Sequence, residues 1–377
     1  MGNYAPALDE TKQFALPTVS ATRSRRHRIL DNLPGTPGFC PFVRLTPTLR
    51  ESPASTLRRE ADAILQNYPP EILYRAVRFL YVRETKSSFE IERLTPDRKR
   101  TEAFVGLLQA SPTGAWDMPW LVSVQNAIVD PRYANTDWRT SQVYVGETVA
   151  PGRERVHFIA PKPSDLPSLM ESWLSAAQRL FAVPTEAGMD DIALAAALSF
   201  AFVFLHPFDD GNGRIHRFLL HDILRRRGFT PDASILPVSA VLLKRTLLYD
   251  RMLESFSSRL MPRLRWDIDE QGAVSVQGES ADLYRYPDCT FLAESFASVV
   301  RETIETEWKA ELDVLVDYDR ARARMRDVVD LPEQKANLFL RLVLQNGGRL
   351  SARKRTLFTE LTDAEIGALE QAVKAPS

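Results

Sequence analysis

The sequence is poor in glycine, has almost no cysteine, and has no excess of either charge. Its 16 glycines among 377 residues are about 4%, against a usual ~7%. The two cysteines, Cys40 and Cys289, lie far apart, which excludes a disulfide framework and a cysteine-rich zinc site. Lys and Arg number 48 against 49 Asp and Glu, and this balance argues against binding nucleic acid or a membrane through bulk charge.

The chain also lacks a long hydrophobic run and a targeting signal. The longest nearly apolar run, Ile192 to Leu205, has 14 residues, whereas a membrane span needs about 20. This run therefore predicts a buried core helix. No basic start followed by an apolar segment is found at the N-terminus, so we expect no signal peptide and a soluble, cytoplasmic protein without membrane contact.

The spacing of hydrophobic residues predicts a mainly α-helical fold with one or two small hairpins. Helices are predicted at about 97–108, 120–128, 165–182, 189–205, 212–227 and 239–260. Two β-like runs, at 142–146 and 155–159, are separated by the turn residues Pro151 and Gly152 and predict a β-hairpin. A second small hairpin is expected at 267–276.

We divide the chain into five segments. These are an N-terminal arm with little independent structure (1–60), a helical segment (61–114), a catalytic core (115–262), a linker with a small hairpin (263–290) and a highly charged C-terminal helical domain (291–377).

The most informative segment runs from His206 to Arg217 and reads HPFDDGNGRIHR. It joins the apolar run to an amphipathic helix that Gly228 is expected to cap. Free N–H groups at a helix start attract anions, and Gly211 and Gly213 let the backbone approach a phosphate. Arg214 and Arg217, three residues apart, share another face of the helix and add charge-assisted hydrogen bonds.

The same segment carries an acid and a base. Asp210 would repel a phosphate unless a Mg²⁺ ion lay between them, and His206 is suited to accept a proton from a hydroxyl. The alternative is an ordinary turn in which His206 caps a helix. The segment is not a P-loop, a dinucleotide fingerprint or an HExxH zinc site.

At every fixed position this segment resembles the signature of the Fic family, HPFxDGNGRxxR. Residues 138–146 and 158–163 resemble the family's flap hairpin, and 236–240 and 282–286 resemble downstream segments of multi-domain bacterial members. The likeness extends over about 70–377. It implies a Fic-type helical core with a β-hairpin flap, an N-terminal helical segment and a C-terminal helical domain.

The resemblance implies a protein adenylyltransferase that moves AMP from ATP to a Ser, Thr or Tyr hydroxyl of a protein. His206 would then be the general base, and Asp210 would bind Mg²⁺. The remaining motif residues would bind the nucleotide: Gly211, Asn212 and Gly213 as an anion hole, Arg214 at the β-phosphate and Arg217 at the γ-phosphate. Asn212 and Arg214 could otherwise be plain helix-start residues.

The flap is expected to dock the target protein. Its residues Gln142, Val143, Tyr144 and Val145 could receive a segment of the target as an added strand. The alternative is a structural hairpin that only covers the site.

An inhibitory motif is expected before the core. Fic proteins often carry [ST]xxxE[GN], and here Ser88 and Glu92 have the required spacing. Glu92 could pair with Arg217 and withhold it from the γ-phosphate, which would leave ATP in an unproductive pose. The next residue is Arg93 rather than Gly or Asn, a departure from the motif. The alternative is a solvated glutamate at a helix end.

Other functions stay open at this point. Some family members phosphorylate their target and others remove AMP. A different class would be a regulatory, DNA-binding protein whose Fic core senses nucleotide, because 320–326 and 349–355 are basic. Interspersed acids favour solvated helix faces there, so we do not expect nucleic-acid binding. The target, self-modification, nucleotide preference and a homodimer are not decided by the sequence.

Overall fold

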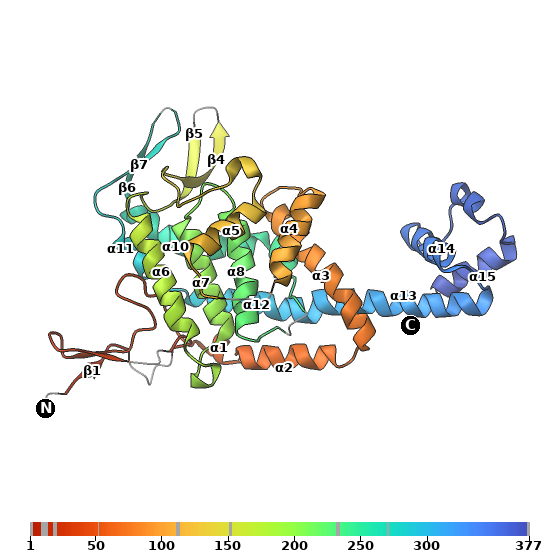
Figure 1. Cartoon of the computed structure of the whole chain (residues 1–377), viewed down its shortest axis with the longest axis horizontal. Coiled ribbons are helices and arrows are strands. Elements are labelled where there is room, and N and C mark those ends of the chain that lie inside the picture. The colour runs from red at the N-terminus through yellow and green to blue at the C-terminus, as the bar shows by residue number, and fades with distance from the viewer. Residues whose placement is uncertain are drawn as a thin grey trace. The chain divides into compact units, whose positions relative to one another are not determined.

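The computed structural model describes residues 3–8, 14–17, 21–51, 53–110, 114–150, 153–230, 234–269 and 271–374. The chain forms two compact units, one of Met1–Gln66 with Val77–Trp308 and one of Asn67–Ala76 with Lys309–Ser377 (Figure 1). The predicted catalytic segment, 115–262, falls wholly in the first unit, whereas the predicted C-terminal domain, 291–377, is divided at Trp308. The five-segment division stays a prediction.

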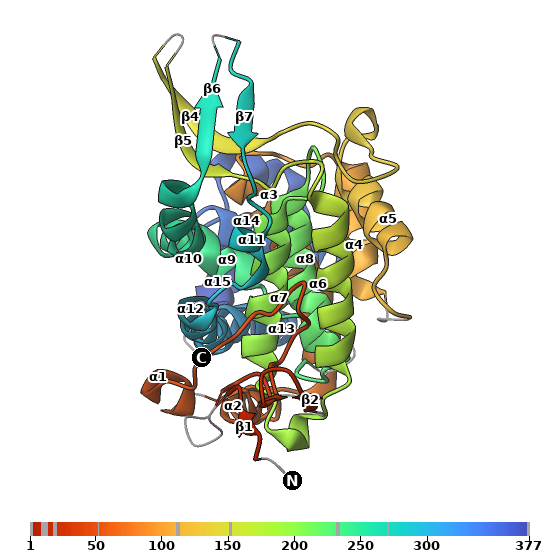
Figure 2. The ribbon, with the colours of Figure 1, turned by 90° about the vertical axis from the view of Figure 1, so that its left-hand side faces the viewer.

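Helix α7 (Asp191–Leu205) forms the centre of the first unit. Every residue of it except Val203 is buried, as the apolar run predicts. Asp190 caps its start by accepting a 2.8 Å hydrogen bond from the backbone N–H of Ala193. Helices α6 (Leu166–Phe181), α8 (Asn212–Arg226) and α12 (Thr290–Glu302) pack against α7 (Figure 2). The predicted helices at 165–182 and 189–205 are confirmed.

Helix α8 ends as predicted at Gly228. This glycine has a φ of +62°, a left-handed conformation that glycine adopts without steric cost. Its N–H donates to the carbonyl of Arg225, and the next N–H, of Phe229, donates to that of Leu224. This is the Schellman arrangement, which satisfies the carbonyls at the helix end.

Further helices surround this centre. They are α1 (Pro47–Glu51), α2 (Ala54–Leu65), the later turns of α3 (Pro70–Ile91), α4 (Arg98–Gln109), α5 (Met118–Ile128), α9 (Val238–Lys244), α10 (Thr246–Leu260) and α11 (Asp282–Arg285), with a π-helical stretch at Thr303–Trp308. The single helix predicted at 239–260 is wrong, because the backbone leaves the helical region at Arg245 (φ −114°, ψ 48°) and divides it into α9 and α10.

In the ranges that the structure describes, three small sheets complete the first unit. Strands β4 (Tyr144–Ala150) and β5 (Arg153–Ile159) form the predicted antiparallel hairpin, whose turn residues Pro151 and Gly152 lie outside the described residues. Strands β6 (Arg265–Ile268) and β7 (Val274–Gln277) form the second predicted hairpin. Near the N-terminus, β1 (Ala5–Pro6), β2 (Thr22–Ser24) and β3 (Ile29–Asp31) make a sheet in the order β1-β3-β2. The arm therefore has more regular structure than the sequence predicts.

The second unit is built from α13 (Lys309–Val328), α14 (Glu333–Gln345), a 3₁₀ stretch (Ala352–Phe358) and α15 (Asp363–Lys374). Its core is apolar and includes Phe339 and Phe358, whose rings meet edge to face at 5.2 Å. The start of α3 joins this unit, because Tyr68 donates to Asp313 at 2.6 Å and Arg75 pairs with Asp319.

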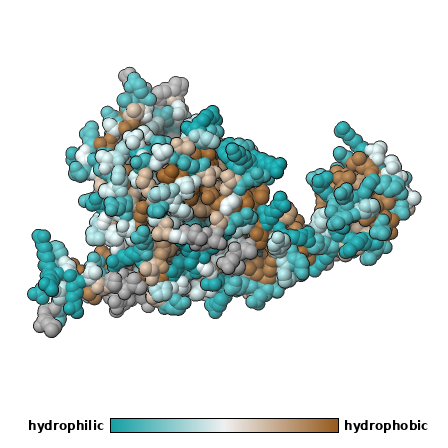
Figure 3. Space-filling model, in the orientation of Figure 1, coloured by the Kyte–Doolittle hydropathy of each residue, from teal (hydrophilic) through white to brown (hydrophobic). Residues whose placement is uncertain are grey.

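The predicted mainly α fold is confirmed. On the face shown in Figure 3, hydrophilic residues predominate and hydrophobic ones are visible between them, as expected when the apolar stripes of helices face inward. Within the described residues, no helix is both long and apolar enough to span a membrane.

Candidate active site

The loop between α7 and α8 is shaped by two left-handed residues. His206 ends α7 with φ 49° and ψ 58°, a conformation that costs a non-glycine residue about 1–2 kcal/mol. Gly211 begins α8 with a φ of +89°, and a Cβ there would lie 2.7 Å from Cγ1 of Val129. Glycine is therefore required at 211 both for its backbone and for space.

Side chains brace this loop from within and from α5. The amide of Asn212 donates to the carbonyl of Phe208 at 2.8 Å, and its oxygen accepts from the N–H of Phe208. Gln125 of α5 is fully buried and donates to the carbonyl of Tyr133, to the side-chain oxygen of Asn135 and, at 3.3 Å, to the carbonyl of Asp210. The side chain of Asn212 therefore stabilises the loop, while its backbone is part of the predicted anion hole.

His206 is arranged to accept a proton through one ring nitrogen. Its Nδ1 lies 3.1 Å from the carbonyl of Val203, which can only accept, so Nδ1 carries the hydrogen and Nε2 has the free lone pair. Desolvation lowers the pKa of His206 to about 4, and the nearby positive charge of Arg139 acts in the same direction. The ring is therefore neutral and able to act as a base at neutral pH.

The two predicted phosphate-binding arginines are buried, each 1% exposed. Nε of Arg214 lies 2.7 Å from Oε2 of Glu92, and the terminal NH2 of Arg217 donates to Oε1 of the same carboxylate at 2.8 Å. The sequence predicts a contact of Glu92 with Arg217 alone, whereas the structure places the carboxylate between both arginines. Ser88 also holds the guanidinium of Arg217, because its hydroxyl and carbonyl oxygens both accept hydrogen bonds from Arg217, at 2.8 and 2.7 Å.

The position of Glu92 explains the glycine at 213. Gly213 has no left-handed backbone, so its requirement is one of space. A Cβ at this position would lie 2.4 Å from Oε1 of Glu92 and 3.3 Å from a terminal nitrogen of Arg217. The carboxylate therefore occupies the space beside a bare backbone at a helix start, where anions bind favourably.

Asp210 faces the same side of the loop. Its Oδ1 accepts from the N–H of Gly211 at 2.6 Å and from the terminal NH2 of Arg214 at 2.8 Å. In the described part of the chain, no three His, Cys, Asp or Glu side chains are grouped as metal ligands. A single carboxylate beside a phosphate site nevertheless suits Mg²⁺, which is commonly held by one or two carboxylates, water and substrate phosphates.

The base of the flap contacts this loop, because the hydroxyl of Ser141 donates to Oδ1 of Asp209 at 2.8 Å. Gln142 donates to the carbonyl of Ala160 at 2.8 Å, and the N–H of Ala160 donates to the carbonyl of Val143. Tyr144 and Val145 begin strand β4, and the Val145 side chain is exposed. Of the strands in the described ranges, only β5 pairs with β4, so the other edge of β4 has no strand partner.

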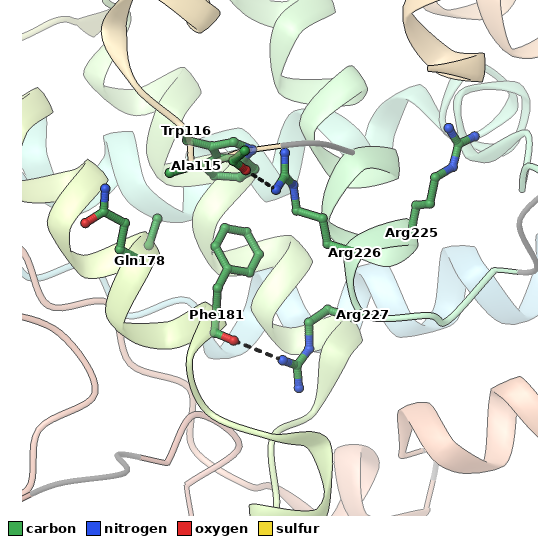
Figure 4. Close-up of a pocket in the computed structure, with 9 residues that line it drawn as sticks. Ala115, Trp116, Gln178, Phe181, Arg225, Arg226 and Arg227 are labelled. Atoms are coloured by element: carbon green, nitrogen blue, oxygen red, sulfur yellow. Dashed lines mark hydrogen bonds between the residues drawn. The ribbon is translucent and has the colours of Figure 1, made fainter. Parts of the chain in front are cut away.

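Three residues that hold the site were missed by the sequence analysis. They are Gln125, Glu84 of α3, which contacts α8, and Arg139, which contacts the backbone of His206. None of them has a local sequence signal for its contact with the loop or with α8, since Asp210, His206 and His221 are distant in the sequence from Gln125, Arg139 and Glu84. A pocket of about 540 Å³ at the far end of α8, lined by Trp116, Phe181 and 225–227, contains none of the predicted site residues (Figure 4).

Residues 116–224 match the model of the Fic/DOC family. The chain is 39% identical over 106 residues to the protein adenylyltransferase Fic of Aedes aegypti. The aligned residues are 27% of this chain and 18% of that protein. The chain is 32% identical over 181 residues to the protein adenylyltransferase fic-1 of Caenorhabditis briggsae, covering 46% and 31%. It therefore spans less than a third of the length of these relatives.

Among solved structures, a Fic family protein from Desulfovibrio desulfuricans superposes with a TM-score of 0.47 and 21% identity, covering 83% of this chain and 87% of that one. The matched segment, 116–224, contains the loop from His206 to Arg217 and the flap hairpin, in agreement with the resemblance seen in the sequence. The chain therefore carries a domain of the Fic/DOC family, formed by residues 116–224.

Proposed function

We propose that this protein is an adenylyltransferase that moves AMP from ATP to a Ser, Thr or Tyr hydroxyl of a protein, and that Glu92 inhibits it. The observation that carries the proposal is the carboxylate of Glu92 between Arg214 and Arg217, beside the bare backbone of Gly213. Such a site binds anions, and its present occupant belongs to the chain itself. The adenylyltransferase names of the relatives in the family domain support the choice of reaction.

In the proposed reaction, His206 is the general base. The target hydroxyl attacks the α-phosphorus of ATP, its proton passes to Nε2 of His206, a bond forms between the target oxygen and phosphorus, and pyrophosphate leaves. Nε2 is free because Nδ1 is directed at the carbonyl of Val203. The lowered pKa of His206 keeps this nitrogen unprotonated before the attack.

The remaining charged groups of the site would bind the triphosphate. Arg214 and Arg217 would hold the β- and γ-phosphates, and the backbone at 211–213 would stabilise developing negative charge. Asp210 would hold Mg²⁺, which supplies further neutralisation of the phosphates. The side chain of Asp210 is 40% exposed, so its carboxylate is accessible to such an ion.

The inhibition has a direct electrostatic reason. Two carboxylate oxygens already contact both arginines, and Ser88 fixes the orientation of Arg217. A γ-phosphate would have to displace this carboxylate or bind elsewhere, since two anions cannot share the same donors. ATP would then be bound in a pose that does not align the α-phosphorus with the target hydroxyl.

The proposal is tested by incubating the wild type, Glu92→Gly and His206→Ala with each NTP and Mg²⁺, followed by intact-mass spectrometry. We expect ATP to give an adduct of AMP mass, more with Glu92→Gly than with the wild type. His206→Ala should keep ATP binding and lose transfer by about 10²–10⁴-fold. Self-modification would appear as an adduct on the chain itself.

Glu90→Gly is the matched control, because Glu90 is an exposed glutamate in the last turn of α3, two residues before Glu92. It should leave the transfer rate unchanged. An adduct of phosphate mass, or release of AMP from a modified protein, would replace the proposed reaction with another. Equal rates for Glu92→Gly and the wild type would contradict the inhibitory role alone.

A further inference from the structure

Arg139 forms an unusual set of contacts in the segment that precedes the flap. Its side chain is buried, with 2% of the residue exposed. Nε donates to the carbonyl of His206 at 2.7 Å, and the two terminal nitrogens donate to the carbonyls of Ser141 and Pro161, both at 2.6 Å. Its backbone N–H donates to the carbonyl of Pro207 at 2.9 Å. One residue therefore holds four backbone carbonyls.

These carbonyls belong to two parts of the site. His206 and Pro207 are the start of the catalytic loop, and His206 is held there in its left-handed conformation. Ser141 precedes β4 and Pro161 follows β5, so they mark the two ends of the flap hairpin. The planar guanidinium of Arg139 thus connects the backbone of His206 to both ends of the flap hairpin.

The contacts depend on the geometry of arginine. Its guanidinium presents several N–H donors in a rigid fork, whereas lysine offers a point charge on a flexible stem. Over the described part of the chain, no carboxylate forms an ion pair with Arg139, and the nearby Asp209 accepts hydrogen bonds from Ser141 and Asn135. Desolvation lowers the pKa of Arg139 to about 10, so the group stays charged at neutral pH.

We propose that Arg139 is a positioning residue that fixes His206 and both ends of the flap in one frame. The inference rests on the proposed function, together with the expectation that a target segment docks on β4 and presents its hydroxyl to Nε2 of His206. In that reaction the distance between the flap and the base decides whether the hydroxyl is aligned. Arg139 sets this distance without contacting the nucleotide site, since its hydrogen bonds in the described part of the chain go to backbone carbonyls outside 210–217.

The test uses the full chain carrying Glu92→Gly, with Arg139→Lys, Arg139→Ala or the control Arg227→Lys added. Arg227 is also a buried arginine (8% of its side chain exposed) that connects separate segments, through Asp191, Val183 and Thr185. It lies at the other end of α8. Transfer kinetics, ATP binding, circular dichroism and hydrogen–deuterium exchange are measured for each variant.

We expect Arg139→Lys to lower kcat of transfer by about 10²-fold, as a misplacement of about 1 Å does, with KM for ATP within about twofold of its parent. Amide exchange should rise together in 141–160 and at His206. Guanidinium ion should restore part of the activity of Arg139→Ala, and ethylammonium should not. Arg227→Lys should leave kcat and the exchange of these segments unchanged.

Two outcomes would overturn the inference. One is an unchanged exchange rate of the flap in a folded Arg139→Lys protein, which requires no transfer activity to observe. The other is a loss of activity that is proportional to the unfolded fraction of the variant, or a substitution that raises KM for ATP by as large a factor as it lowers kcat. If the Glu92→Gly parent itself transfers nothing while exchange rises as expected, the proposed reaction is wrong and the positioning of His206 and the flap by Arg139 stands.

Discussion

Two glutamates, Glu84 and Glu92, connect the same segment to helix α8 in different ways. Glu84 is fully buried within α3, and its Oε1 lies 2.8 Å from Nε2 of His221. The hydroxyl of Ser239 donates to the same oxygen, and the N–H of Ser239 donates to Oε2 at 2.9 Å. Glu92, just after α3, is 26% exposed and contacts Arg214 and Arg217.

The contact of Glu84 is permanent, whereas that of Glu92 is exchangeable, because a triphosphate could replace the carboxylate. The partners of Glu84 come from α8 and the start of α9, and no solvent reaches the carboxylate. The partners of Glu92 are the arginines that a triphosphate would use, and the carboxylate is partly exposed. We infer that Glu84 keeps α3 attached to α8 while Glu92 can leave, so that release of the site does not require unfolding of the helix.

The largest effect should come from breaking the permanent contact. Glu84→Ala leaves His221 and Ser239 without their partner in a buried site, and we expect a loss of about 3–5 kcal/mol in the free energy of unfolding. Glu92→Ala should cost less, about 1–3 kcal/mol, because Arg214 keeps Asp210 and Arg217 keeps Ser88 as a partner. Urea unfolding of both variants measures the difference, and equal losses would remove the distinction between the two contacts.

A smaller effect is expected from filling the space beside Glu92. The Cβ of Gly213→Ala would lie 2.4 Å from Oε1 of Glu92, so the carboxylate must move, at a cost of about 1–3 kcal/mol typical of overpacking. In a Glu92→Gly background this clash is absent and the cost should largely vanish. A double-mutant cycle on the free energy of unfolding tests this, and additive effects would show that the carboxylate lies elsewhere.

The pH dependence should also depend on Glu92. Desolvation lowers the pKa of His206 to about 4, and the negative charge of Glu92 opposes that shift, as does that of Asp210. Because the base must be unprotonated, kcat/KM should stay level from neutral pH to about 5 and fall below about 4, about tenfold per pH unit, which is ~1.4 kcal/mol.

Removing Glu92 should lower the pKa of His206 further, so Glu92→Gly should move the acidic limb of the kcat/KM profile to lower pH. The measurement is transfer at subsaturating ATP in overlapping buffers, with circular dichroism to confirm that the protein stays folded. An acidic limb near the ordinary histidine pKa of 6.5 would contradict the role of desolvation.

How much the sequence predicts depends on how local the cause is. The buried run at 192–205, the cap at Gly228 and the two hairpins follow from residues near one another, and all are found. The residues of the motif from His206 to Arg217 are also local, and the structure brings them together with Ser88 and Glu92.

Contacts between distant residues could not be predicted in the same way. Arg139 and Glu84 act on partners 67 and more than 130 positions away, and an isolated arginine or glutamate gives no periodic or turn signal. The break at Arg245 was missed for a related reason, because no Gly or Pro marks it and the apolar pattern continues on both sides.

The smallest effect concerns Arg93, the residue that departs from the inhibitory motif. Its φ is +57°, a left-handed conformation that glycine and asparagine adopt more readily than arginine. The motif's preference at this position is thus explained by the backbone that turns the chain directly after Glu92. Arg93 keeps the turn, since its N–H donates to the carbonyl of Glu90 at 2.8 Å, but at a steric cost.

Arg93→Gly should therefore favour the conformation that directs Glu92 at Arg214 and Arg217. We expect a gain of about 0.5–1 kcal/mol in the free energy of unfolding, reduced by the greater freedom of glycine in the unfolded chain, and a two- to fivefold lower basal transfer rate. Arg93→Ala, which removes the side chain and keeps the Cβ, should give neither. A higher transfer rate in Arg93→Gly would mean that the Arg93 side chain itself, and not the turn, holds Glu92 at the site, and the exchangeable contact would then depend on a third charged residue.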